Sequence, residues 1–400
     1  MKKQLWVIFQ VLTLIFGFTN ISGATNGMRL IGIGPIQRSM GGANVGLPKD
    51  STAAITNPAG LIKLERRLDV AFTAFDPSVE YEATSSFGQV TTNGKKIKSK
   101  AQPFPVPGLG VILPINEEWT FGFGGYGLSG MGVDYASNLY NNRTFTEYSF
   151  LKLAPGFSYK VNERLAVGFA PNINYAEMNF EAGSPAEVPH RDGKAWGIGA
   201  TFGILYDISE KVSFGFAYET KQVFQDFEFD TVSGRDELSF DQPQSLTAGL
   251  GIKSTERLRF AADVQWIDWE QIMGVNKPSY KVNNSGASPY NMRWSDQFVY
   301  KFGAEYDLND KWQLRAGYNY GEEPTEATQP FEVIAFPGIA EHHFTAGFGY
   351  QINQDLELNV GFMYAPTVNK IASNASGQFL DTSKSSMSQY SVDVGLSWKF

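Results

Sequence analysis

The chain has 400 residues, a formal net charge of −8 and no cysteine. The length allows two ordinary domains or one large barrel, and the acidic balance argues against a nucleic-acid partner. The lack of cysteine excludes disulfides, thiolate metal sites and a cysteine nucleophile. Since there are also only three histidines, His190, His342 and His343, we predict no metal site and no cofactor.

Residues 1–24 have the features of a secretory signal peptide. Lys2 and Lys3 precede an apolar run over Leu5–Phe18, and the small residues Ser22-Gly23-Ala24 follow it, which is the order that signal peptidase reads. We predict cleavage after Ala24. The alternative is a membrane anchor, but the apolar run is shorter than the ~20 residues that a spanning helix needs.

Residues 25–65 are rich in glycine and alanine and do not alternate as a strand does. Asp50-Ser51-Thr52 can cap a short helix through Ala53–Ile55, and Asn57-Pro58 should end it, because a residue before proline avoids the helical region. A glycine-rich phosphate loop is the alternative, but no strand pattern precedes the glycines and no lysine followed by serine or threonine comes directly after them. We interpret 25–65 as a hatch, a plug inside a barrel.

From Leu68 to the end the side chains alternate between apolar and polar. Tyr390, Val392, Val394, Leu396, Trp398 and Phe400 share one face of the last strand, with polar and small residues on the other. Such stripes run about 9–13 residues, whereas globular strands usually have ~5–6 and a tilted strand needs ~9–11 to cross a bilayer. A soluble sandwich is therefore the weaker alternative.

We count fourteen strands within 66–400, joined alternately by tight turns and by long loops. An even number of strands with short turns at one end and long loops at the other is typical of bacterial outer-membrane barrels. Tyrosines beside the tight turns suit an interfacial girdle, and the chain ends on the aromatic Phe400. We predict an all-β, 14-stranded antiparallel transmembrane β-barrel of the bacterial outer membrane, with the hatch in its lumen.

The chain resembles the FadL family of outer-membrane transporters of hydrophobic compounds. The resemblance lies in Gly27, Gly32-Ile33-Gly34, Met40-Gly41-Gly42-Ala43, Asp50-Ser51-Thr52-Ala53-Ala54 and Asn57-Pro58-Ala59-Gly60-Leu61. It implies a plugged barrel that takes a hydrophobic ligand from outside and releases it sideways into the bilayer. The hatch motif is then Asn57, Pro58, Ala59 and Gly60. The resemblance also implies an inward kink in the third strand.

The third strand, Trp119–Gly127, contains Gly122, Gly124, Gly125 and Gly127. Glycines weaken the packing of a ladder and permit a bend, so we predict that they form the kink and the lateral exit. The alternative is that they give a small-residue lumen face that packs against the hatch. The two interpretations are compatible.

The loop 128–146 is the predicted place of ligand uptake. Apolar residues exposed on an outward loop are an aggregation liability unless they bind a ligand. These residues are Leu128, Met131, Val133, Tyr135, Leu139, Tyr140 and Phe145. A self-packed loop that caps the barrel is the alternative. Arg143, Arg191 and Arg315 are candidate cations for a carboxylate head group, although an ordinary lumen salt bridge explains each of them as well.

The predicted function is passive outer-membrane transport of a hydrophobic small molecule, most simply a long-chain fatty acid. Alternatives are an aromatic hydrocarbon channel and a general diffusion porin, which would lack the hatch. An enzyme would need a catalytic partner beside His190, His342 or His343, and no such motif accompanies them, so we predict no catalytic residues. A secondary receptor or adhesin role stays open. We expect a monomer surrounded by outer-membrane lipid.

Overall fold

The structure of the protein is a computed structural model. It describes residues 26–84, 94–101, 103–139, 142–182, 190–231, 234–283, 288–289, 291–325, 336–373 and 382–400. The predicted signal peptide, residues 1–24, lies outside the described residues. Within the described ranges, no helix is long and apolar enough to cross a membrane.

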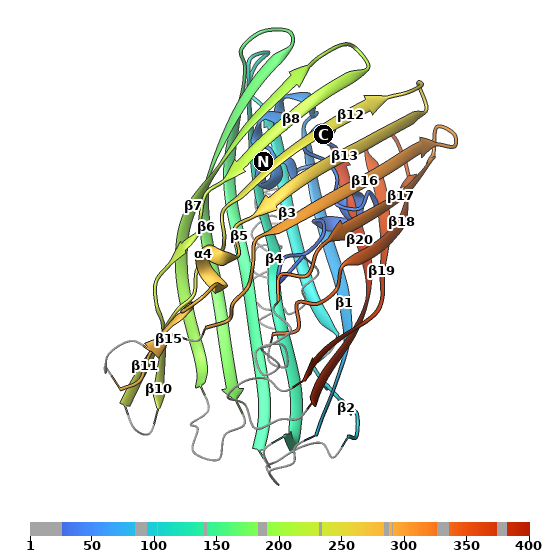
Figure 1. Ribbon diagram of the computed structural model, residues 1–400. Coiled ribbons are helices and arrows are strands. Elements are labelled where there is room, and N and C mark those ends of the chain that lie inside the picture. Colours follow the sequence, from blue (N-terminus) through green and yellow to red (C-terminus); the bar gives the residue numbers. More distant parts are fainter. Residues whose placement is uncertain are drawn as a thin grey trace.

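Fourteen antiparallel strands form one closed barrel (Figure 1). They are β1 (Arg67–Thr84), β3 (Phe104–Pro114), β4 (Trp119–Leu139), β5 (Asn142–Lys160), β6 (Leu165–Ala182), β7 (His190–Asp207), β8 (Val212–Glu219), β12 (Ser245–Lys253), β13 (Leu258–Ile267), β16 (Gln297–Asp307), β17 (Trp312–Gly321), β18 (His342–Gln351), β19 (Leu356–Ser373) and β20 (Thr382–Lys399). The barrel closes because β1 pairs with β20 on one side and with β3 on the other. The predicted fold class is confirmed.

The wall alternates as the sequence predicts. In β20, Tyr390, Val392 and Leu396 are 51%, 44% and 44% exposed, whereas Ser391 and Asp393 between them are buried. Large apolar side chains cover the outer face of the other strands in the same way. An apolar outer face and a polar inner face suit a barrel whose surroundings are lipid and whose lumen is filled.

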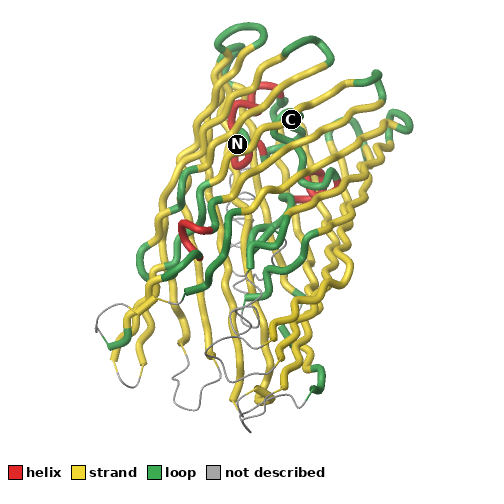
Figure 2. Tube along the Cα trace, viewed as in Figure 1, coloured by secondary structure: helices red, strands yellow, loops and turns green. Residues whose placement is uncertain are grey.

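The hatch segment, the described residues 26–65 of the predicted hatch, lies inside the barrel and carries three short helices (Figure 2). They are α2 (Gly34–Ser39), α3 (Ala53–Thr56) and η1 (Pro58–Lys63). The helix α2 contacts β17–β20 and β1, whereas η1 contacts β4–β7, so the segment spans the lumen from wall to wall. Nearly all its side chains up to Leu61 are buried.

Small elements lie at the end of the barrel that carries the long connections, which we call the long-loop end. They are β2 (Ile97–Lys98), β9 (Val223–Phe224), β10 (Phe227–Thr231), β11 (Gly234–Ser239), α4 (Glu270–Met273), β14 (Ser279–Lys281) and β15 (Ser288–Pro289). β10, β11, β14 and β15 form a separate four-stranded sheet beside the barrel wall. The opposite end carries only tight turns and is called the tight-turn end.

The strands β4 and β5 are longer than predicted. The strand β4 ends at Leu139 and β5 begins at Asn142, so most of residues 128–146 is a hairpin of the barrel wall. The prediction of a loop there is wrong. The hairpin continues the ladder beyond the apolar belt, and its outward side chains include the polar Asp134 and Arg143.

Candidate functional site: a lateral seam, a lumen cavity and an aromatic cluster

The motif Asn57–Gly60 anchors the hatch segment to the wall. Asn57 Nδ2 donates hydrogen bonds to the carbonyl oxygens of Val45 and Ile204, at 2.9 and 3.1 Å, and its Oδ1 accepts one from Ala59 N. A Cβ atom at Gly203 would lie 2.1 Å from Asn57 Oδ1, and one at Gly168 would lie 2.2 Å from Ala59 N. Glycine in the wall therefore permits the motif to dock directly on the strand backbone.

Replacing Asn57 by alanine should destabilise the docked hatch. The variant removes three hydrogen bonds, of which those to Val45 O and from Ala59 N are buried, and each buried group that stays unpaired costs about 1–3 kcal/mol. We expect a lower thermal denaturation midpoint and impaired uptake, with the barrel still inserted in the membrane. The control is Asn309→Ala, which removes a side-chain oxygen that accepts from Lys311 N and Trp312 N in an exposed turn. Equal midpoints for the two variants would contradict the anchoring role.

The ladder between β3 and β4, the strand predicted to carry the kink, ends early. β3 pairs with β4 only from Gly108↔Tyr126 to Pro114↔Thr120, although its earlier residues 104–107 still pair with β1. The next backbone bond between β4 and the segment that precedes β3 is donated by Lys100 N to Asp134 O, at 2.9 Å. We call the stretch between residues 104–107 of β3 and 127–130 of β4 the seam.

Two prolines explain why the ladder stops. Pro105 and Pro107 still lie opposite Ala74 and Phe72 of β1. In an antiparallel pair a residue directs both its N–H and its C=O to the same neighbour. Residues of β3 therefore face β1 and β4 in turn. Phe104 and Val106, which have N–H groups, bond to β1, and the nitrogens of Pro105 and Pro107 face β4 without a hydrogen to donate. The edge of β3 thus lacks the donors that would close the seam.

The hatch segment takes the place of β3 along the seam. Leu30 N donates to Leu128 O at 3.0 Å, Gly130 N donates to Met28 O at 3.1 Å, and Ser129 Oγ donates to the same oxygen at 2.6 Å. The pairing of β4 with β5 also shifts register between Gly127 and Ser129. The backbone groups of β4 at the seam therefore form their hydrogen bonds with the hatch segment and not with β3.

Of the glycines predicted to form the kink, only Gly127 borders the irregularity. Cβ atoms at Gly122 and Gly124 would lie 2.5 Å from Leu61 and 3.1 Å from Ile55, so these two glycines pack against the hatch segment. A Cβ at Gly125 would instead meet Leu153, at 3.2 Å. Gly122 and Gly124 therefore fit the alternative of a small-residue lumen face, while the kink and the lateral exit stay predictions.

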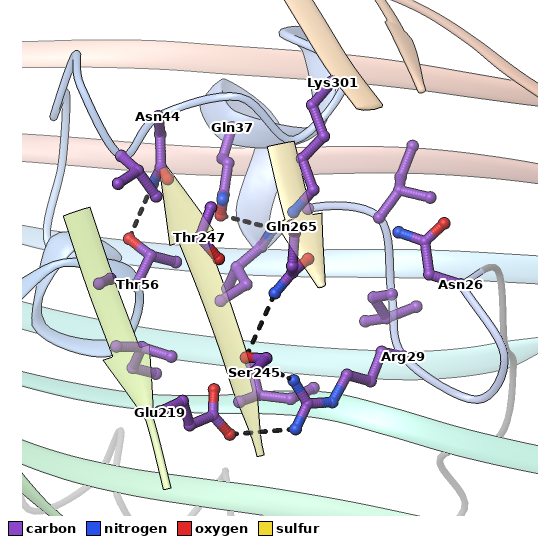
Figure 3. Close-up of a pocket in the computed structure, with 18 of the residues that line it drawn as sticks. Asn26, Arg29, Gln37, Asn44, Thr56, Glu219, Ser245, Thr247, Gln265 and Lys301 are labelled. Carbon is purple, nitrogen blue, oxygen red and sulfur yellow. Dashed lines mark hydrogen bonds and ion pairs between the residues drawn. The ribbon is translucent and has the colours of Figure 1, made fainter. Parts of the chain in front are cut away.

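A cavity of about 80 Å³ lies beside the seam, between the hatch segment and the wall (Figure 3). Such a volume holds several waters, since one needs about 10–15 Å³ by this measure. Arg29, Lys301 and Glu219 line it, together with Leu128 and Phe150. It combines charged groups with apolar walls.

The cations of the cavity differ in their partners. Glu219 forms ion pairs with Arg29 at 3.2 Å and with Lys152 at 2.7 Å. Lys301 is 7% exposed and forms no hydrogen bond or close ion pair within the described residues, although the charges of Asp263 and Glu219 attract it. The carboxylate opposite it in register, Asp263, accepts from the backbone of Asn44 at 2.8 Å. A buried amine that makes no hydrogen bond is costly, so this site suits an additional anionic group that can accept one.

An apolar cluster adjoins the cavity toward the long-loop end, and we call it the aromatic cluster. Its buried members are Met28, Met131, Tyr148, Phe150, Ala176, Met178, Phe180, Ala195, Phe224, Phe227, Phe229, Leu238, Phe240, Ile267, Trp269, Ile272, Met273, Met292, Trp294 and Val299. Methionine and aromatic side chains adapt to ligands of varied shape. Leu128 packs against this cluster and also against the apolar residues beside the seam.

The residues predicted to take up the ligand do not form one groove but lie in different parts of the barrel. Met131 belongs to the aromatic cluster, while Val133 and Tyr135 are fully buried in a second cluster of the lumen. Phe145 faces outward, where the guanidinium carbons of Arg143 and Arg191 lie 4.2 and 4.7 Å from its ring centre. The side chain of Leu139 and all of Tyr140 lie outside the described residues. Their role in uptake stays a prediction.

The three predicted head-group cations are all paired. Arg143 bonds Asp134 at 2.8 Å, and Arg191 bonds Glu181 at 2.5 Å. Arg143 and Arg191 point away from the lumen, because they alternate with the buried Thr144 and His190. Arg315 is in the lumen and donates to Glu305 at 2.7 Å. Binding of a head group by any of them stays a prediction, and the geometry favours Lys301.

Two of the histidines, His190 and His342, have structural partners. His190 Nε2 lies 2.8 Å from Asp236 Oδ2 and 2.7 Å from the Tyr280 hydroxyl, within the aromatic cluster's rim. Burial raises the pKa of Asp236, but hydrogen bonds from His190, Asn283 and Tyr280 outweigh burial and hold it below its ordinary value. His342 Nδ1 lies 2.7 Å from the Tyr318 hydroxyl. These contacts fasten the β10–β11 hairpin and β18.

The prolines of β3, Arg29 and Lys301 were not predicted to be functional residues. The alternation Pro103-Phe104-Pro105-Val106-Pro107 is a readable signal, because prolines two apart remove every donor from one edge of a strand. Lys301 shows no such signal. It is one of many polar residues on the inner face, and the hatch segment binds the carboxylate opposite it, Asp263, through the backbone of Asn44 and Val45.

The chain is similar in sequence and in fold to known outer-membrane proteins. The sequence profile of the outer membrane protein transport proteins (OMPP1/FadL/TodX) matches residues 31–397. The chain is 24% identical to outer membrane protein P1 of Haemophilus influenzae over 70% of this chain and 72% of that protein. It is equally identical to the long-chain fatty acid transport protein of Escherichia coli K12, over 77% and 80%. The crystal structure of the Pseudomonas putida toluene transporter TodX superposes with a TM-score of 0.75 and 21% identity, covering 93% and 99% of the two chains.

Proposed function

Because the chain belongs to the OMPP1/FadL/TodX family of outer membrane transport proteins, we propose that it carries long-chain fatty acids passively through the wall of its barrel. Members of the family transport hydrophobic compounds, and this chain is an outer-membrane β-barrel of that kind. In the proposed route the ligand enters at the aromatic cluster, passes the cavity and leaves through the seam into the bilayer.

The observation that carries the proposal is that Lys301, beside an apolar lining, makes no hydrogen bond or close ion pair with any described residue. A carboxylate that reaches the cavity gains a charge-assisted hydrogen bond from Lys301. The tail of the same molecule can lie against Leu128, Phe150 and the aromatic cluster, and each CH₂ that leaves water contributes ~0.8 kcal/mol. Neutral hydrocarbons would use the apolar contacts alone.

Sideways release suits such a ligand. A tail that moves from the apolar lumen into lipid stays in an apolar phase, so no large desolvation cost opposes its exit. The hatch segment fills the lumen between the wall strands, which supports a route through the seam over a water-filled pore along the axis.

The test is uptake by vesicles that contain lipopolysaccharide in their outer leaflet, with and without the purified protein. Three labelled probes are compared: a long-chain fatty acid, an aromatic hydrocarbon and a small sugar. We expect stimulated uptake of the fatty acid and no leakage of the sugar. Stimulation of the hydrocarbon alone would favour the alternative ligand, and sugar leakage without stimulation of either would favour a general porin.

A further inference from the structure

Tyr126 lies at the edge of the seam where the β3–β4 ladder ends, which we call the lip. It is the last residue of β4 that pairs with β3, opposite Gly108, and it is 3% exposed. A Cβ atom at Gly108 would lie 2.2 Å from the tyrosine ring. The ring therefore crosses from β4 over the backbone of β3 on the lumen side, at the point where the ladder ends.

Ser51 of the hatch segment holds this ring in place. Ser51 Oγ and the Tyr126 hydroxyl are 2.8 Å apart, and Ser51 N donates to Asp69 Oδ2 of β1 at 2.9 Å. A Cβ atom at Gly110 of β3 would lie 2.2 Å from Ser51 Oγ. One hatch residue thus connects β1 to β4 across the short strand β3 that lies between them.

The ring also borders the proposed path. Tyr126 packs in one cluster with Ile33 and Ile55, and Leu128 packs against that cluster. Ile33, Ile55 and Leu128 line the cavity as well. A tail that moves from the cavity toward the seam therefore meets the ring of Tyr126 along the way.

We propose that the Ser51–Tyr126 hydrogen bond is a latch that controls lateral release. With the bond formed, the ring covers the lip of the seam and the hatch segment is fixed to β1 and β4. When the bond opens, the ring can turn away from Gly108 and the seam widens next to Leu128. The inference deepens the proposed function and rests on it, because it names the group that regulates the exit.

The strength of the contact suits a latch. A hydrogen bond between two neutral hydroxyls contributes little net stability, so its loss should change the open population by about two- to ten-fold. The tyrosine ring itself remains wedged over Gly108, which keeps the seam covered most of the time. Removing one hydroxyl should therefore speed release without unfolding the barrel.

The experiment compares Tyr126→Phe, Ser51→Ala and the double variant with wild type. Tyr218→Phe is the matched control, because it removes a tyrosine hydrogen bond, to Gln244 at 2.9 Å, on the outer face of β8. We expect both single variants to raise uptake at least two-fold. The double variant should equal the single ones, since all three remove the same bond. Tyr218→Phe should match wild type.

A second readout separates the latch from the transported ligand. Hydrogen exchange of the backbone amides of residues 51–57 should accelerate in Tyr126→Phe and Ser51→Ala but not in Tyr218→Phe. Wild-type transport with unchanged uptake in both single variants would overturn the latch. If wild type transports no probe, the proposed function fails, and the latch is then decided by exchange alone, where unchanged rates overturn it.

Discussion

Replacing Pro105 and Pro107 of β3 by valine is expected to lower fatty-acid uptake about ten-fold. Valine restores two N–H donors on the edge of β3 that faces β4, and it keeps an apolar side chain on the outer face, where both prolines are partly exposed. Each ladder bond contributes about 0.5–1.5 kcal/mol, so two bonds that close the seam correspond to roughly ten-fold or more in the open population. Uptake by lipopolysaccharide-containing vesicles measures the effect.

The matched control is Pro155→Val. Pro155 also lies in a wall strand, but β5 and β6 keep the same register on both sides of it, from Leu153↔Ile173 to Phe157↔Phe169. A proline there interrupts the bonds without separating the strands, and its replacement should leave uptake unchanged. Normal uptake by a folded Pro105/Pro107 variant would instead show that the hatch segment, and not the prolines, keeps the seam apart.

The barrel was predictable from the sequence because the lipid imposes the pattern. Every second residue of a spanning strand must be apolar, which makes β20 readable from Tyr390 to Phe400 without any tertiary information. Beyond the lipid this constraint ends. In the hairpin of β4 and β5 the apolar residues Met131, Val133 and Tyr135 point inward and Asp134 points outward. The alternation persists there with reversed faces, so a search for an apolar outer stripe mistakes the hairpin for a loop.

The site was less predictable because pairing across strands decides which charges are free. Arg315 lies opposite Glu305 in the register of β16 and β17 and is neutralised by it. Lys301 lies opposite Asp263 in the same kind of register, yet that carboxylate is bound by the backbone of Asn44 and Val45. The fold of the hatch segment thus determines which lumen cation remains available.

The second large effect is expected for Lys301→Met, which should lower fatty-acid uptake about ten-fold or more. The variant removes a charge-assisted hydrogen bond, which contributes about 1.5–3 kcal/mol, and it preserves an unbranched side chain of similar length. Uptake of an aromatic hydrocarbon should stay within two-fold of wild type, because such a ligand has no head group to lose. The ratio of the two uptake rates is the quantity to measure.

Two further variants make the result specific to the cavity. Lys301→Arg keeps the charge and should retain most of the fatty-acid uptake. Lys160→Met removes a lysine whose partner is the exposed Glu163 at a tight turn, and it should alter neither ligand's uptake. If Lys301→Met lowers uptake of both ligands equally, the lysine supports the packing of the hatch segment. If it lowers only that of the acid, the lumen cation selects the carboxylate, and the same barrel would carry hydrocarbons through its apolar contacts alone.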